Sequence, residues 1–378
     1  MYQKNIKENN ENKIFEYVFN SNHNFVINEI ADKMDMSFPT VKRIVTFFLE
    51  KNILIEEDKV GSGVGRKARE YSFNDFFCHS VGVQISEDKI RIILTNAKGI
   101  VIKRHAKTFL KNSILITDAL MEELEFFLSR LSKTVFKSII GIGISVPGIV
   151  SEEGKFIEFN SKNKTDISII EKIKKKFDIP VLVENESNLS AIAEAFLSEN
   201  SLLSNFTTLT INDHVGVSSF NKEKNKNGFY FKAGRVHHMI VNPDGRLCEC
   251  GSKGCWGAYV SNNALFESFH SVFKKLKKYE NIFQDEYLGT KEGKKLLDEY
   301  IKYLAIGIKN LLFFSNPEKL IISGKICHHQ KYIKDKLLEK IYTDHIFYRG
   351  KETIIFSSFD EDSSLIGAAI FPIVDSLF

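Results

Sequence analysis

The chain has 378 residues, of which 43% are hydrophobic and 26% are charged, a balance typical of folded globular proteins. This length exceeds one ordinary domain of about 100–200 residues, so we expect two or three domains. No uncharged apolar run approaches the length of a membrane span, and the N-terminus lacks the pattern of a secretory leader. We therefore expect a cytoplasmic protein without membrane contact. A formal net charge of +4 is too small to indicate a nucleic-acid partner without a local pattern.

Residues 12 to 74 have the pattern of three short helices followed by a hairpin. Apolar residues recur at helical spacing in the first two helices. Ser37 is placed to cap a third helix that carries Pro39 in its first turn. Two strand-like runs then flank a glycine-rich loop. This order predicts a winged helix-turn-helix over residues 1–76.

The placement of charge, rather than its total, favours DNA as the partner of this domain. Lys42 and Arg43 stand near the start of the third helix, where a recognition helix meets base edges and phosphates. The loop from Lys59 to Arg69 holds four cations and no acid, and its glycines allow close approach to a DNA backbone. A helical interaction module with an ordinary hairpin is the alternative. The candidate DNA-binding residues are Ser37, Phe38, Thr40, Lys42, Arg43, Arg66 and Lys67.

The remainder of the chain alternates strands and helices. This alternation predicts two α/β lobes with a cleft between them. We expect the first α/β lobe over residues 77–198 and the second over residues 199–378.

Three cysteines and a histidine within 18 residues predict a metal site in the second lobe. His238, Cys248, Cys250 and Cys255 supply one imidazole and three thiols, which is a donor set of closed, structural zinc sites. His237 is a competing imidazole that spacing alone does not exclude. Reduced cysteines without a metal are the alternative for the cluster as a whole.

The segment from Gly234 to Met239, followed by Cys248-x-Cys250-Gly251-x-x-Gly254-Cys255, resembles the zinc signature of the ROK family. This family comprises bacterial repressors and sugar kinases, and the N-terminal domain resembles its xylose and N-acetylglucosamine repressor branch. The resemblance covers nearly the whole chain. It implies a fold in which the winged helix-turn-helix precedes a two-lobed actin-like ATPase (ribonuclease H-like) body that carries a structural Zn²⁺.

The residues that the resemblance places at the kinase site depart from the family pattern. The turn after Val83 lacks the glycine and threonine of the family's first phosphate loop, and Asn212-Asp213-His214 replaces most of the second loop. Glu186 stands where the family has a catalytic Asp, and one additional methylene misplaces the carboxylate by about 1 Å, which can lower a rate about 100-fold. We therefore predict no enzymatic activity and no bound ATP.

The sugar cleft implied by the resemblance is only partly preserved. Asn160, Asn185 and His238 match family positions that contact sugar hydroxyls. Two family glutamates are replaced by Arg235 and Gly257, and a guanidinium donates hydrogen bonds and prefers anions. We therefore expect that Arg235 lets the cleft accept a phosphorylated or acidic sugar, or that the cleft has lost its ligand. A surface or interlobe salt bridge is the alternative role for Arg235. The candidate effector-binding residues are Asn160, Asn185, Glu186, Arg235 and His238.

These observations predict a ROK-type transcriptional regulator, expected to be a repressor, that binds operator DNA as a homodimer or homotetramer. Its body is expected to bind a sugar or sugar phosphate as effector. Two alternatives remain at this stage. One is an ATP-dependent sugar kinase with an appended DNA-binding domain, and the other is a DNA-binding regulator without a sugar effector.

Overall fold

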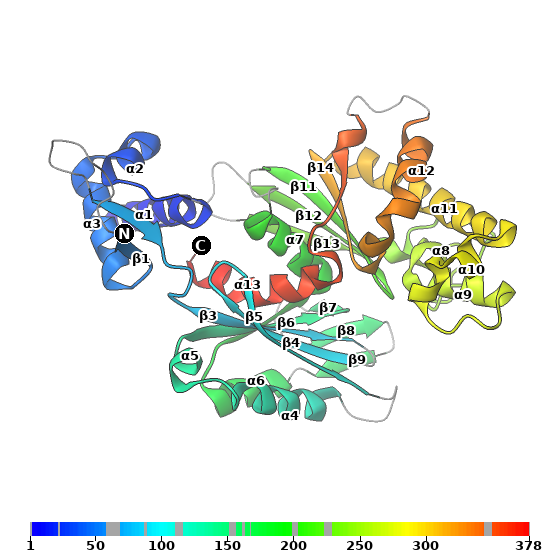
Figure 1. Ribbon diagram of the computed structural model, residues 1–378, viewed down its shortest axis with the longest axis horizontal. Helices are drawn as coiled ribbons and strands as arrows, with labels where there is room; N and C mark the ends of the chain where they lie inside the picture. Colours follow the sequence, from blue (N-terminus) through cyan, green and yellow to red (C-terminus); the bar gives the residue numbers. More distant parts are fainter. Residues whose placement is uncertain are drawn as a thin grey trace.

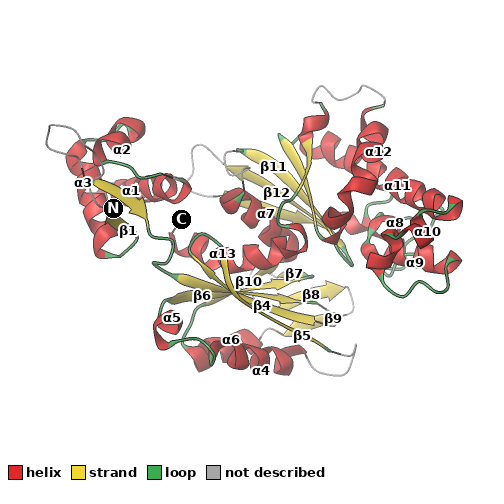
Figure 2. Ribbon diagram, in the orientation of Figure 1, coloured by secondary structure: helices red, strands yellow, loops and turns green. Residues whose placement is uncertain are grey.

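The computed structural model describes residues 2–21, 23–57, 69–86, 89–109, 116–150, 156–160, 163–166, 168–198, 203–222, 229–343 and 350–377. An N-terminal domain lies beside a body of two lobes, each built around a sheet (Figures 1 and 2). Within the described ranges, no helix has both the length and the apolar character needed to cross a membrane.

Three helices and an antiparallel hairpin form the N-terminal domain, which confirms the predicted winged-helix architecture. Their apolar side chains share one core, in which Ile14 and Ile44 are almost fully buried. The tip of the hairpin, residues 58–68, lies outside the described residues. The elements are α1 (Tyr2–Asn20), α2 (Ile27–Met34), α3 (Phe38–Glu50), β1 (Leu54–Glu57) and β2 (Glu70–Phe73).

The start of α3 differs in detail from the sequence prediction. Ser37 occupies the N-cap position with extended backbone, but its side chain makes no capping hydrogen bond. Its hydroxyl instead pairs with the Thr40 hydroxyl at 2.9 Å. Ser37 thus occupies the predicted N-cap position without a side-chain cap, and Pro39 occupies the first turn as predicted.

The first lobe contains a five-stranded sheet in the order β10-β6-β3-β4-β5. β3, β6 and β10 run parallel, whereas β4 and β5 pair antiparallel at one edge. A second, three-stranded sheet extends from this lobe. The elements are β3 (His79–Ile85), β4 (Lys89–Asn96), β5 (Val101–Thr108), α4 (Ile116–Leu128), α5 (Lys133–Lys137), β6 (Ile139–Val146), β7 (Ile149–Val150), β8 (Phe156–Asn160), β9 (Asn163–Asp166), α6 (Ser168–Phe177), β10 (Val181–Asn185) and α7 (Glu186–Leu197).

The second lobe repeats the topology of the first. Its sheet has the order β13-β12-β11-β14-β15, with an antiparallel meander followed by two parallel strands. The elements are β11 (Asn205–Ile211), β12 (Val215–Lys222), β13 (Phe229–Gly234), α8 (Gly257–Val260), α9 (Asn262–Val272), α10 (Asp285–Leu288), α11 (Lys291–Ser315), β14 (Lys319–Ser323), α12 (Gln330–Tyr342), β15 (Ile354–Phe356) and α13 (Ser363–Leu377).

Helices α7 and α13 form the layer between the two sheets (Figure 1). Helix α13 returns from the second lobe and packs on β3 and β6 of the first, while α7 packs on β11 and β12 of the second. An added Cβ at Gly143 on β6 would lie 1.9 Å from the Ala368 carbonyl oxygen, so α13 packs this closely only because Gly143 has no side chain. The remaining helices cover the outer faces, with α4 and α6 on the first sheet and α8, α9, α11 and α12 on the second.

Candidate functional site

The candidate DNA-binding residues of α3 lie mainly on its outer face. Phe38 is 47% exposed, and Lys42 and Arg43 are also exposed. Thr40 is half-buried and its hydroxyl is engaged by Ser37. The opposite face of α3, with Val41, Ile44, Val45 and Phe48, is buried in the domain core. The remaining two candidates, Arg66 and Lys67, lie outside the described residues.

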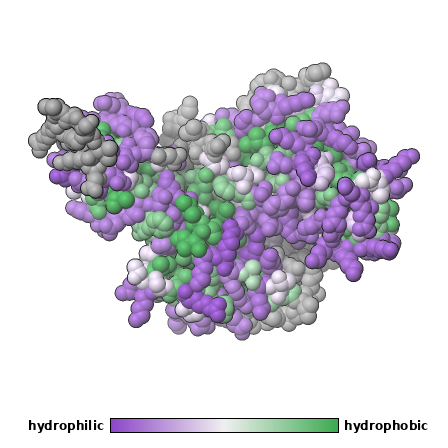
Figure 3. Space-filling view, viewed as in Figure 1, coloured by the Kyte–Doolittle hydropathy of each residue, from purple (hydrophilic) through white to green (hydrophobic). Residues whose placement is uncertain are grey.

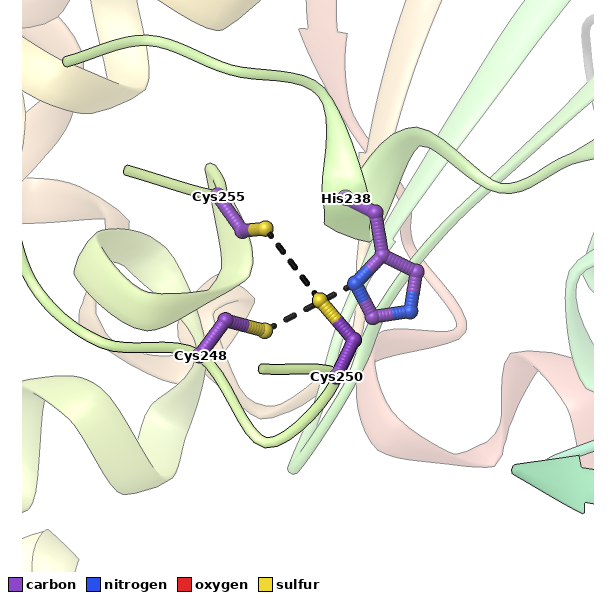
Figure 4. Close-up of side chains that lie close together, drawn as sticks. All are labelled: His238, Cys248, Cys250 and Cys255. Atoms are coloured by element: carbon purple, nitrogen blue, oxygen red, sulfur yellow. Dashed lines mark hydrogen bonds between the residues drawn. The ribbon is translucent and has the colours of Figure 1, made fainter. Parts of the chain in front are cut away.

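A compact loop between β13 and α8 brings the four candidate metal ligands together. His238 ends a 3₁₀ turn at Val236–His238, and the three cysteines follow in a loop that ends at α8 (Figure 4). The loop is closed by backbone hydrogen bonds, including Cys248 N–H to the Ser252 carbonyl at 2.8 Å. Trp256 anchors the loop to the body, because it is fully buried and its indole N–H donates to the Tyr303 carbonyl at 2.9 Å.

The geometry of this cluster fits a tetrahedral zinc ion. His238 Nδ1 lies 3.6 Å from Cys248 Sγ, and Cys250 Sγ lies 3.7 Å from Cys255 Sγ. A tetrahedral site with Zn–S bonds of about 2.3 Å separates its sulfur ligands by about 3.8 Å. The four donor atoms all lie within 4.8 Å of one another. The ion would therefore be held by His238, Cys248, Cys250 and Cys255, and it would cross-link the loop between β13 and α8, which we call the zinc loop.

The environment shifts the pKa values of the three thiols in opposite directions, raising those of Cys248 and Cys255 and lowering that of Cys250 through a backbone hydrogen bond from Ser252. Burial and the two neighbouring thiols raise the pKa of the Cys255 thiol to about 12, and burial is the main factor that raises the pKa of Cys248. A bound cation stabilises the thiolate forms that burial otherwise disfavours at Cys248 and Cys255. The donor set is complete without water, as in structural rather than catalytic zinc sites.

His237, the competing imidazole, does not lie with the three thiols. Its Nδ1 accepts a hydrogen bond from the Val215 N–H at 3.2 Å. Its ring occupies the space that a side chain at residue 257 would need, because an added Cβ at Gly257 would lie 2.1 Å from His237 Cε1. The histidine and the glycine therefore form a steric pair, which the sequence analysis missed. Neither His237 nor Gly257, taken alone in the sequence, indicates that the two residues are in contact.

His214, His237 and Glu249 form a second polar group beside the zinc loop, with donor atoms within 4.8 Å of one another. Burial, followed by the charges of His214 and His238, lowers the pKa of His237 to about 4, so its ring is neutral near pH 7. Because Nδ1 accepts from Val215, the hydrogen of the neutral ring is on Nε2, 3.9 Å from Glu249. Nε2 then has no lone pair for an ion, and the group is a polar network that fixes His237.

Of the effector candidates, Glu186 lines the interlobe cavity, whereas Asn185, Arg235 and His238 are not among its lining residues. Asn185 caps α7, accepting from the Ser187 N–H at 2.8 Å and donating to the Gly148 carbonyl at 2.7 Å. Glu186, the next residue, lines a cavity of about 190 Å³ between the lobes. Arg235 is exposed and directly precedes the 3₁₀ turn that ends at His238. Burial lowers the pKa of His238, the charge of Glu249 opposes this shift, and the charge of Arg235 adds to it. The side chain of Asn160 lies outside the described residues.

Glu186 is the most perturbed carboxyl group in the described cleft. Its side chain is buried, and burial together with the nearby Asp213 raises its pKa to about 7. A hydrogen bond with Asn212 and the charge of Arg91 oppose this rise. Near neutral pH the carboxyl is therefore partly protonated, which weakens it as a permanent anion.

Arg91 fills the first-lobe side of this cleft through three hydrogen bonds. Its guanidinium donates to Gln84 Oε1 at 2.7 Å, to Asp362 Oδ1 at 2.7 Å and to the Glu361 carbonyl at 2.8 Å. Arg104 donates to the other oxygen of Asp362 at 2.5 Å. We call these five residues the Arg91 clamp: Gln84, Arg91, Arg104, Glu361 and Asp362. It lies at the strand end where the sequence lacks a phosphate-binding turn, and it ties β4 to the start of α13.

Comparisons with known proteins agree with this architecture. The sequence signature of the ROK family matches residues 80–373. The chain therefore belongs to the ROK family. The xylose repressor of Bacillus spizizenii is 27% identical over 314 residues, which cover 83% of this chain and 81% of the repressor.

Two solved structures show the same fold. A ROK family transcriptional regulator, a homologue of the E. coli MLC protein, matches with a TM-score of 0.77 and 17% identity, over 98% of this chain and 96% of that one. The ROK glucokinase of Streptomyces griseus, solved with glucose and AMPPNP, matches with a TM-score of 0.64 and 19% identity. That match covers 78% of this chain and 98% of the glucokinase.

We predict that Cys255→Ser removes most of the bound zinc and lowers the melting temperature, because a lost ligand opens the cross-linked loop. Elemental analysis and thermal denaturation measure both effects. Cys78→Ala, which removes a buried thiol outside the cluster, is expected to retain the zinc of the parent. A parent protein without zinc, or a Cys255→Ser variant with full zinc content, would contradict the assignment.

We predict that Glu186→Gln changes the pH dependence of stability. The folded chain binds the Glu186 proton more tightly than the unfolded chain, because its pKa is raised from 4.5 to about 7. The free energy of unfolding of the parent should therefore fall, relative to Glu186→Gln, by about 2–3 kcal/mol as pH rises from about 4.5 through 7. Urea denaturation at pH 5 and pH 8 measures this difference, and Glu171→Gln on the exposed face of α6 is the control. Equal pH profiles for the parent and Glu186→Gln would refute this account of the cleft.

Proposed function

We propose that this chain is a ROK-type transcriptional regulator whose winged helix binds operator DNA and whose body has no kinase activity. The observation that carries the proposal is the combination of an exposed basic face on α3 with a cleft in which the Arg91 clamp stands beside the degenerate phosphate loops. The similarity to xylose repressors over more than four-fifths of both chains supports a repressor.

The outer face of α3 has the chemistry of a DNA-reading surface. Lys42 and Arg43 extend from an exposed face whose other side is fixed in the domain core. A rigid helix with cations near its N-terminal end can enter a major groove and meet base edges and phosphates. We propose Ser37, Phe38, Thr40, Lys42 and Arg43 as contacts on this helix, with Arg66 and Lys67 as contacts on the wing.

The cleft argues against phosphoryl transfer. The guanidinium of Arg91 is already satisfied by Gln84, Glu361 and Asp362, so it is not available to a nucleotide phosphate. Asp213 and Glu186 on the opposite wall repel a polyphosphate in their ionised forms. An ATP-dependent sugar kinase is the alternative, and ATP turnover with glucose, xylose or N-acetylglucosamine would establish it.

We propose a sugar that carries an anionic group as the effector. Arg235 and His238 present donors at the edge of the zinc loop, and Lys89 and Lys325 line the cleft. Asn185 and Glu186 supply polar groups at the start of α7. The zinc ion braces the loop that carries His238. A regulator without a sugar effector is the second alternative.

We further propose that the protein acts in the cytoplasm as a homodimer or homotetramer, with a winged helix over residues 1–76 and lobes over 77–198 and 199–378. Two winged helices related by symmetry would meet half-sites on one face of the duplex, which favours a roughly palindromic operator. A ligand that prefers one arrangement of the lobes would shift DNA affinity only by its difference in affinity between the arrangements.

We predict that Arg43→Ala weakens operator binding about 10- to 100-fold, because a base or phosphate contact is lost. Fluorescence anisotropy on the duplex upstream of the chain's own gene, titrated against salt and an unrelated duplex, measures the affinity. Lys295→Ala on α11, an exposed lysine of the second lobe, is the matched control and should bind as the parent does. Unchanged affinity in Arg43→Ala would exclude α3 as the recognition helix.

We predict that glucose 6-phosphate binds more tightly than glucose or xylose, and that Arg235→Gln removes this preference. The reason is that a guanidinium pairs with a phosphate through charge-assisted hydrogen bonds. Isothermal titration measures the affinities, and Lys253→Gln removes another exposed cation of the same loop as a control. Tight binding of a neutral sugar without binding of its phosphate would reject the anionic effector.

A further inference from the structure

The turn between β4 and β5 is a rigid projection of the first lobe towards the winged helix. Asn96 is fully buried, and its Oδ1 accepts hydrogen bonds from the N–H groups of Lys98 at 3.1 Å and Ile100 at 2.9 Å. The Ala97 N–H donates to the Asp75 carbonyl at 2.9 Å. Since Asp75 lies two residues after β2, the last strand of the winged helix, this bond fixes the turn against the connection between the two domains.

The side chain of Lys98 extends from this turn and contacts the winged helix. Its ammonium lies 4.7 Å from the ring centroid of Phe19 and 4.9 Å from that of Phe73. It also donates a hydrogen bond to the Phe19 carbonyl, in the last turn of α1. Carbonyl groups in the last turn of a helix lack partners within the helix and carry its negative dipole end. Lys98 therefore satisfies a helix terminus and two aromatic faces at once.

The two rings beneath Lys98 belong to the core of the winged helix. Phe19 is 3% exposed, and Phe73 packs edge-on against it with centroids 5.5 Å apart. A cation over an aromatic face is attracted more strongly where water is excluded, and Lys98 is half-buried. Burial lowers its pKa while the Asp75 charge raises it. The contact is thus between a fixed part of the body and a fixed part of the DNA-binding domain.

The same turn rests on the end of α7. An added Cβ at Gly99 would lie 2.4 Å from Leu197 Cδ1, and Gly99 has a φ of +72°. Leu197 also packs against the winged-helix core. Helix α7 begins at Glu186 in the interlobe cleft and is about 18 Å long at 1.5 Å per residue. One rigid element therefore joins the cleft to the junction that Lys98 holds.

We propose that Lys98 is a positioning residue, which fixes the orientation of the winged helix on the body at the point where α7 ends. The proposal rests on the proposed function, because orientation matters where paired recognition helices must meet half-sites at a set spacing. Lys98 binds the Phe19 carbonyl and the rings of Phe19 and Phe73, not DNA. Its removal loosens the junction and leaves the DNA-binding face of α3 intact.

Hydrogen exchange of the full-length chain, followed by mass spectrometry, tests the junction directly. Lys98→Met keeps the length of the side chain but loses its charge and its donor. We expect exchange in residues 15–21 and 95–100 to accelerate about tenfold or more, whereas Lys98→Arg restores the parent's rate. Parent-like exchange in Lys98→Met, or equal acceleration in Lys98→Arg, would overturn the proposal.

Lys103→Met is a close control because it removes the same kind of contact within the body alone. Lys103 lies 5.6 Å from the ring centroid of Phe127 and donates to the Arg130 carbonyl just after α4. We expect residues 15–21 to exchange as in the parent. Acceleration there in Lys103→Met would show that general loosening of the lobe, rather than loss of the junction, explains the effect of Lys98→Met.

Operator binding separates positioning from direct contact with DNA. We expect Lys98→Met to weaken binding about tenfold with an unchanged dependence on salt, since a lost phosphate contact would lower the salt slope by about 1. A reduced slope would show that Lys98 binds phosphate and would overturn the positioning role. If the parent binds no duplex specifically, the proposed function fails, while the exchange measurement still decides whether Lys98 holds the junction.

Discussion

The layer of α7 and α13 between the two sheets is the constraint on which the rest of the body depends. Each helix is covered on both sides, so neither sheet can move without changing the packing of the layer. The apolar residues that fill it come from both lobes, as with Ile192 of α7 and Phe206 of β11. Because α7 carries cleft residues at one end and a winged-helix contact at the other, the packing that stabilises the fold also links the two candidate functional regions.

Arg91, a partly buried cation of the cleft, is paired with hydrogen-bond acceptors, as buried charges usually are. The Arg91 side chain is only 15% exposed, and its guanidinium donates to three acceptors. A buried charge without partners is costly, and these three acceptors offset that cost for Arg91. Figure 3 shows hydrophilic residues over much of the visible surface of the second lobe, with hydrophobic residues among them. The Arg91 clamp thus places satisfied ion pairs at the strand end where the sequence lacks a phosphate-binding turn.

Local patterns in the sequence predicted much of this structure, and contacts between distant segments account for what they missed. The three N-terminal helices and the zinc ligands were predictable because their signals lie within about 20 residues. Spacing left His237 and His238 equivalent, and only the fold places His238 with the thiols. The Arg91 clamp joins residues about 270 positions apart, and Lys98 meets Phe19 across 79 positions. No periodicity signals such pairs, since each residue alone reads as an ordinary surface cation. Ser37 holds the predicted N-cap position, but its hydroxyl pairs with the Thr40 hydroxyl instead of a backbone N–H.

Trp256 gives the zinc loop an optical property of its own. It is the only tryptophan of the chain, it directly follows the last cysteine of the cluster, and it is fully sheltered from solvent. Indole emission shifts to longer wavelength when the ring meets water, so intrinsic fluorescence of the unmodified protein reports on this loop and its anchorage to α11. The winged helix contributes no tryptophan to that signal. Tryptophan fluorescence therefore follows opening of the metal loop separately from any movement of the winged helix, without an introduced probe.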